Sequence, residues 1–249
     1  MKSAEILSNT DRTSWSRIAM VWRFYLPYTR RKLILFTATA VFIEIFTLIS
    51  VKHLTTDGAD TIIKMMSALM TVLIGCSALV FAKPKGRELQ AMLPALGIEK
   101  CVVLISYVTI IIPFIALCTS TVSYFFLRDE YPPLIALFSK GTGEAAVVIA
   151  YSILFLEGMA LSCLWGVLST HRKHAMRNGL LAVAGFYLGT MILIATISFC
   201  VGFYIAFTSQ EVDFTFKTQS LFKIMTLICG IYVIFALIKC CHTIKSGQY

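Results

Sequence analysis

Six long apolar stretches, separated by short polar segments, limit this chain to a membrane-spanning helical fold. Each is about 18 residues or longer, the length that a helix needs to cross a hydrocarbon core of about 30 Å. They cover residues 33–51, 65–82, 101–127, 145–170, 179–207 and 221–238. Hydrophobic residues make up 58% of the chain and charged residues 14%, which is more apolar than a soluble domain. We therefore predict an all-α, polytopic membrane protein with six transmembrane helices.

The distribution of Lys and Arg predicts that both ends of the chain lie in the cytoplasm. Basic residues precede the first stretch and recur in the second and fourth loops and after the last stretch, whereas acidic residues dilute them in the other loops. This alternation follows the positive-inside rule and requires an even number of spans. The net charge of +9 is therefore explained by membrane topology, and we expect no nucleic-acid partner. We divide the chain into a cytoplasmic segment 1–32, one transmembrane domain 33–238 and a cytoplasmic tail 239–249.

Residues 13–32 have the pattern of a surface helix that precedes the first span. Aromatic and aliphatic residues recur at helical spacing, and arginines between them can reach anionic headgroups. The apolar positions are Trp15, Ile18, Trp22, Tyr25 and Leu26. We predict an interfacial amphipathic helix that bends near Pro27. The alternative is a basic topology anchor with incidental aromatic residues.

The second cytoplasmic loop, 83–100, contains a short amphipathic segment. Pro94 limits any helix before it to about two turns, because the residue before proline avoids the α region. Leu93 lies on its apolar edge, and Arg87, Glu88 and Gln90 are polar. Such a helix suits a groove on a soluble partner. The alternative is a solvated loop whose apolar residues dip into the membrane surface.

This order of parts resembles the permease subunits of type-2 ATP-binding-cassette exporters. Those proteins have an N-terminal interfacial helix, six spans and a short coupling helix after the second span. The phrase Leu93-Pro94-Ala95-Leu96-Gly97-Ile98-Glu99-Lys100 also resembles a Leu-Pro-Ala…Glu-Lys signature of a Bacteroidetes-like branch, with Leu96 where that branch has a small polar residue.

The resemblance implies a bacterial inner-membrane permease that moves a hydrophobic or amphipathic substrate outward. It implies a second permease subunit, identical or related, and a cytoplasmic ATPase subunit that binds the ATP. The chain has no G-x-x-x-x-G-K-[ST] phosphate loop, so ATP hydrolysis is expected on the partner, and we expect no cofactor or metal in this chain. The residues that the resemblance assigns to ATPase coupling are Arg87, Glu88, Gln90, Leu93, Glu99 and Lys100.

Two carboxylates, Glu44 and Glu157, lie near the middle of the first and fourth apolar stretches. A charged side chain at the bilayer centre costs a few kcal/mol on insertion scales, so each should face protein or water. They either contact a cationic substrate or carry protons, or they hold helices together by hydrogen bonds to neighbours such as Thr39, Thr47 or Ser162. For an ATP-driven exporter we favour the structural role.

Gly185 and Gly189 form a GxxxG pair in the fifth stretch, which permits close helix contact. We favour packing within the chain over a subunit interface.

Three other functions are alternatives to the exporter. An intramembrane protease needs serine–histidine, zinc or paired-aspartate motifs that the stretches lack, so we expect no enzyme. A secondary transporter that uses Glu44 and Glu157, and a membrane scaffold or immunity protein without transport, stay open.

Overall fold

The computed structural model describes residues 15–53, 56–82, 97–127, 142–169, 174–208 and 214–245. These residues are almost entirely helical. The α-helices are α2 (Trp15–His53), α3 (Thr56–Gly75), α5 (Gly97–Ser106), α6 (Ile112–Leu127), α8 (Thr142–Leu168), α9 (Ala175–Thr208) and α10 (Phe214–Lys245). A 3-10 helix, η1 (Ser77–Ala82), follows α3, and a π-helical turn, η2 (Tyr107–Ile111), joins α5 to α6.

Six segments are long and apolar enough to cross a membrane, which confirms the predicted all-α polytopic fold. They are Thr29–His53, Thr61–Ala82, Gly97–Thr121, Ala146–Leu168, Ala175–Cys200 and Leu221–Lys245. Each overlaps one of the six predicted stretches, and the third is built from α5, η2 and α6 together. The chain is a multi-pass membrane protein.

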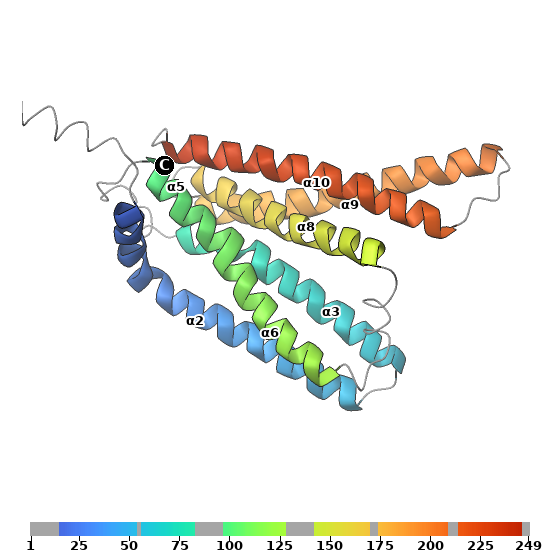
Figure 1. Cartoon of the computed structure of the whole chain (residues 1–249), viewed down its shortest axis with the longest axis horizontal. Helices are drawn as coiled ribbons and strands as arrows, with labels where there is room; N and C mark the ends of the chain where they lie inside the picture. The colour runs from blue at the N-terminus through green and yellow to red at the C-terminus, as the bar shows by residue number, and fades with distance from the viewer. Residues whose placement is uncertain are drawn as a thin grey trace, which may run out of the picture.

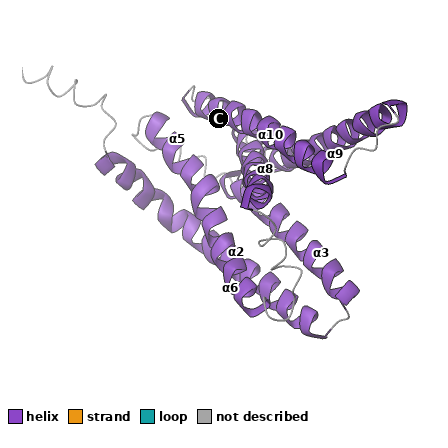
Figure 2. Ribbon diagram, turned by 45° about the vertical axis from the view of Figure 1, so that its right-hand side comes forward, coloured by secondary structure: helices purple, strands orange, loops and turns teal. Residues whose placement is uncertain are grey.

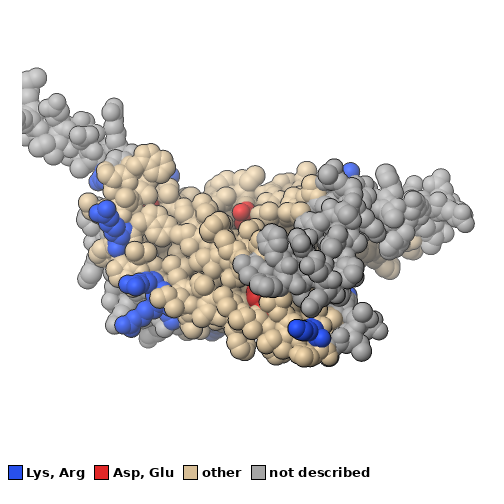
Figure 3. Space-filling view, turned by 60° about the horizontal axis from the view of Figure 1, so that its bottom comes forward, with Lys and Arg blue, Asp and Glu red and all other residues tan. Residues whose placement is uncertain are grey.

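Successive spans run in opposite directions, so α2 begins and α10 ends at the same end of the bundle (Figure 1). Lys and Arg gather at this end on the face shown in Figure 3. The exposed basic residues of α2 and α9 here include Arg23, Arg30, Arg31 and Arg177. The positive-inside rule predicts that this is the cytoplasmic end.

The helices form two groups that meet at α8. In Figures 1 and 2, α2, α3 and α6 lie together on one side, and α8, α9 and α10 lie on the other. α8 packs against α9 and α10 and also against α3 and η1, and α5 packs against both α2 and α10, so these two helices connect the groups. The second half of α9 diverges from α10 in both views, and its span is the least buried of the six.

The N-terminal turns of α2 dock on the bundle through aromatic packing. Tyr25 is 1% exposed and meets Phe81 of η1 edge-to-face at 6.2 Å between ring centroids, and Phe81 meets Tyr107 at 5.3 Å. Such pairs add to the free energy of apolar burial. Trp15 and Leu26 are exposed, so the predicted apolar positions divide between the protein core and the outside.

The predicted surface helix and the first span form one continuous helix, α2, with Pro27 inside it. The first turns lie at an angle to the rest of α2 (Figure 1). Proline removes a backbone hydrogen bond and its ring crowds the preceding turn, which accounts for a bend here.

The third span is also irregular next to a proline. Pro113 cannot donate a hydrogen bond to the carbonyl of Thr109, four residues earlier. The π turn Tyr107–Ile111 lies immediately before it and contains Thr109. Its wider hydrogen-bond spacing shifts the backbone pairing where α5 gives way to α6, so the span continues across the proline.

Candidate functional site

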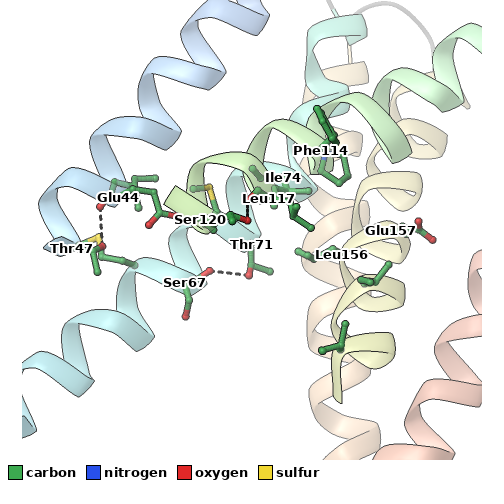
Figure 4. Close-up of a pocket in the computed structure, with 18 of the residues that line it drawn as sticks. Glu44, Thr47, Ser67, Thr71, Ile74, Phe114, Leu117, Ser120, Leu156 and Glu157 are labelled. Atoms are coloured by element: carbon green, nitrogen blue, oxygen red, sulfur yellow. Dashed lines mark hydrogen bonds between the residues drawn. The ribbon is translucent and has the colours of Figure 1, made fainter. Parts of the chain in front are cut away.

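A cavity of about 800 Å³ lies between α2, α3, α6 and α8, at the junction of the two helix groups. Its size falls within the range of about 300–1,000 Å³ that is typical of small-molecule sites. Most of its wall is apolar, including Met66, Met70, Ile74, Phe114, Leu117 and Ile153. Figure 4 shows that these helices bring polar side chains into the same space.

Glu44 is the carboxylate on the α2 wall of the cavity. The hydroxyl of Ser120, on α6, donates a hydrogen bond of 2.6 Å to its Oε1 atom. This length lies within the range of about 2.5–3.0 Å for O–H···O hydrogen bonds. Among the described residues, no Lys or Arg lies within ion-pair distance of Glu44. Glu44 is therefore an oriented acceptor with no cationic partner in this part of the chain.

Each hydroxyl group of the cavity wall donates a hydrogen bond within the protein. In addition to Ser120, they are Thr47, Ser67, Thr71, Thr109 and Thr121. Each of these five donates to a carbonyl three or four residues earlier in its own helix, at 2.7 to 3.0 Å. In this arrangement the hydroxyl oxygens present their lone pairs to the cavity. The cavity therefore offers hydrogen-bond acceptors.

Glu157 belongs to the same cavity wall but is oriented differently. It is half-buried on α8, and in Figure 4 its carboxylate extends away from Glu44 and Ser120. Within the described residues its side chain makes no hydrogen bond or ion pair. The structure thus places both predicted carboxylates at one cavity without bringing them together.

The hydrogen-bond partners that the sequence suggested for the two carboxylates are engaged elsewhere. Thr39 and Thr47 donate to the carbonyls of Leu35 and Ile43. Ser162 bonds to the hydroxyl of Tyr232 at 2.7 Å, and it also donates to the carbonyl of Gly158. The actual partner of Glu44, Ser120, is 76 residues away in the chain. No local pattern could have identified it.

Four of the six predicted coupling residues, Arg87, Glu88, Gln90 and Leu93, lie outside the described residues. Glu99 and Lys100, the other two, form part of the first turn of α5 and are buried. The Nε atom of Arg17, on α2, lies 3.5 Å from Oε1 of Glu99, whose side chain is 1% exposed. The segment from Gly97 is thus already helix, and it is linked to the start of α2. From the sequence, the arginines near the start of α2 were expected only to contact lipid headgroups.

The glycines of α9 do not pack as the sequence suggested. A Cβ atom built at Gly185 or Gly189 would meet nothing within 4 Å, so their pair makes no close contact with the rest of the described chain. Close contacts lie elsewhere: at Gly166 a Cβ would be 2.6 Å from the carbonyl oxygen of Asn178, and at Gly158 it would be 2.6 Å from Phe186. The small residues that allow α8 and α9 to approach are therefore Gly158 and Gly166 on α8 and Gly179 on α9, where a Cβ would lie 2.8 Å from Cγ2 of Val167.

Comparison of the chain with family profiles, with curated proteins and with solved structures finds no match in any of the three.

Proposed function

We propose that this chain is the membrane permease subunit of an ATP-driven exporter. In this proposal a separate cytoplasmic ATPase subunit hydrolyses ATP, and the permease moves a hydrophobic or amphipathic substrate outward across the bacterial inner membrane. The cavity between the two helix groups supplies a binding volume that relative movement of the groups would alter.

The observation that carries this proposal is the ion pair between Arg17 and Glu99. The segment 83–96, which contains the proposed ATPase contact, leads directly into the first turn of α5 at Gly97. Glu99 in that turn is buried and paired with α2. A force applied to the segment would therefore act on α2 and on the third span together. This is the connection that a coupling segment requires.

The exposed glycines of α9 suit the second permease subunit that the proposal requires. Gly185 and Gly189 lie in the least buried span, and Gly202 follows it on α9; each would admit the close approach of another helix. Two copies of the chain, or this chain and a related one, would then complete the transporter.

The test is an affinity purification of the tagged protein from its native host in mild detergent. We expect a soluble ATPase to co-purify in stoichiometric amount. The variants Glu88→Ala and Leu93→Asp should lose the ATPase while inserting into the membrane normally. Ala91→Ser, which changes neither the predicted apolar edge nor the predicted polar contacts, serves as a matched control in the same segment. Recovery of the chain without an ATPase, also after crosslinking, would refute the proposal.

A second candidate function is secondary transport driven by protons. It is favoured by one observation, the placement of Glu44 and Glu157 at a single cavity. In proteoliposomes that lack any ATPase, this function requires substrate flux in response to an imposed pH gradient. The variants Glu44→Gln and Glu157→Gln should then both abolish the flux, whereas the exporter shows no flux without its ATPase.

A further inference from the structure

We propose that the cavity between α2, α3, α6 and α8 binds an amphipathic organic cation, a protonated amine with an apolar body, through Glu44. The assignment of this cation as a transported substrate rests on the proposed permease function. Three features of the cavity select the ligand class: its charge, its hydrogen-bonding capacity and its apolar wall.

The charge of the ligand follows from Glu44. Its Oε1 atom accepts a hydrogen bond of 2.6 Å from the hydroxyl of Ser120, and no described Lys or Arg lies within ion-pair distance of the carboxylate. A carboxylate near the middle of a span costs free energy unless a partner compensates it. A bound cation would supply this partner, whereas a bound anion would be repelled.

The hydrogen-bonding capacity of the cavity favours an ammonium group that carries protons. All six hydroxyls of the wall donate within the protein, one to Glu44 and five to helix carbonyls. A ligand therefore meets acceptors only, and a protonated amine has several N–H donors to satisfy them. Thr47 lies within one helical turn of Glu44, so its oxygen can share such a ligand with the carboxylate.

The remainder of the wall selects an apolar body. Aliphatic and aromatic side chains from α3, α6 and α8 surround the space, among them Met70, Leu117 and Ile153. A volume of about 800 Å³ accommodates a drug-sized molecule. Methionines in the wall adapt to ligands of different shape. A lipid acyl chain would also suit the apolar surface, but it would leave Glu44 without a cation.

The test uses three fluorescent probes with one anthracene body and different charge: 9-(aminomethyl)anthracene as the ammonium, 9-anthracenemethanol as the neutral alcohol and 9-anthracenecarboxylate as the anion. Binding to the full chain is measured by fluorescence anisotropy in phosphatidylcholine nanodiscs, and empty nanodiscs correct for partition into lipid. We expect the ammonium to bind at least about tenfold more tightly than the alcohol, and the carboxylate not to bind.

Three variants test whether the ammonium probe binds at Glu44 in the cavity. Glu44→Gln should weaken ammonium binding about 30-fold, because the ammonium loses its charged partner, and should leave alcohol binding within about twofold. Thr39→Val is the control: Thr39 lies on α2 outside the cavity and donates to the carbonyl of Leu35, so its substitution should not change binding. Leu117→Trp leaves all charges in place but fills the cavity, and it should weaken both the ammonium and the alcohol.

Equal binding of the three probes, or ammonium binding that survives Glu44→Gln, would overturn the proposal. So would a lipid that co-purifies in the cavity and is not displaced by the ammonium probe, as seen by native mass spectrometry. The measurement needs no ATPase, so it fails separately from the exporter proposal. Ammonium binding without a co-purifying ATPase would keep the site and refute the exporter, and the reverse result would refute only the cation site.

Discussion

Substituting Gly166 by alanine is the sharpest test of the contact between α8 and α9. The new Cβ atom would lie 2.6 Å from the carbonyl oxygen of Asn178 and 2.8 Å from Cβ of Ala182. Favourable carbon–carbon contacts begin at about 3.5 Å, so the two helices would have to separate by several tenths of an ångström. The clashing oxygen belongs to the backbone and cannot rotate away. Overpacking of this kind costs about 1–3 kcal/mol.

Gly189→Ala is the matched control. It makes the same chemical change in a helix, but its Cβ would meet nothing within 4 Å. Both substitutions gain about 1 kcal/mol of helix propensity, so their difference isolates the clash at Gly166. We expect Gly189→Ala to keep or raise the Tm. The Tm of Gly166→Ala should be lower than that of Gly189→Ala by about 2–4 °C for each kcal/mol of the clash.

The chain supplies its own reporter for this measurement. Cys163 and Cys240 are free thiols at 0% exposure, so once the accessible thiols, among them the exposed Cys118 and Cys200, have been blocked, a thiol-reactive fluorophore labels these two only when the bundle opens. Both variants are compared with the parent in detergent, under conditions where light scattering shows a monomer, so that subunit contacts do not contribute. Equal Tm values for the two variants, or a lower Tm for Gly189→Ala, would refute the packing of α8 against α9.

Two further predictions concern polar contacts, and the same thiol assay measures them. Arg17→Ala should destabilise the chain by about 1–2 kcal/mol. This is less than the cost of breaking a fully buried pair, because the side chain of Arg17 is 30% exposed. Adding Glu99→Gln should recover part of the loss, and additive losses would contradict the pairing. Tyr232→Phe should cost about 1 kcal/mol because it removes the bond to Ser162. In the Tyr232→Phe background, Ser162→Ala should cost less than it does alone, and an unchanged cost would show that the two hydroxyls do not interact.

The spans could be predicted from the sequence because their signal is local. An apolar run of sufficient length must become a helix in a bilayer, where its backbone groups find no other partners. Helix ends were predicted less well. α10 continues through Lys245, beyond the apolar run that ends at 238, because polar residues also form helix once a helix is under way.

The rotation of each span about its axis could not be predicted. Lipid and protein interiors are equally apolar, so a transmembrane helix gives little amphipathic signal of which face is packed. For this reason the sequence could place Glu44 in a span but could not identify Ser120 as its partner. It also could not show that no other helix packs against Gly185 and Gly189 in the described chain. A GxxxG pair permits close helix contact, but it does not determine which helix makes that contact.

α2 and the third span are joined at two separate points, which bears on how the cavity would change shape. At the cytoplasmic end Arg17 pairs with Glu99, and along the cavity wall Ser120 holds Glu44. These contacts lie roughly 30 Å apart along the third span. A pair of helices tied at both points resists relative rotation, so a force on the segment before Gly97 would move them as one body. α8 faces them across the cavity, and the third span also contacts the other group, through α5 against α10 and η2 against α8. The movement would therefore pivot on these contacts and change the distance between Glu44 and the α8 wall.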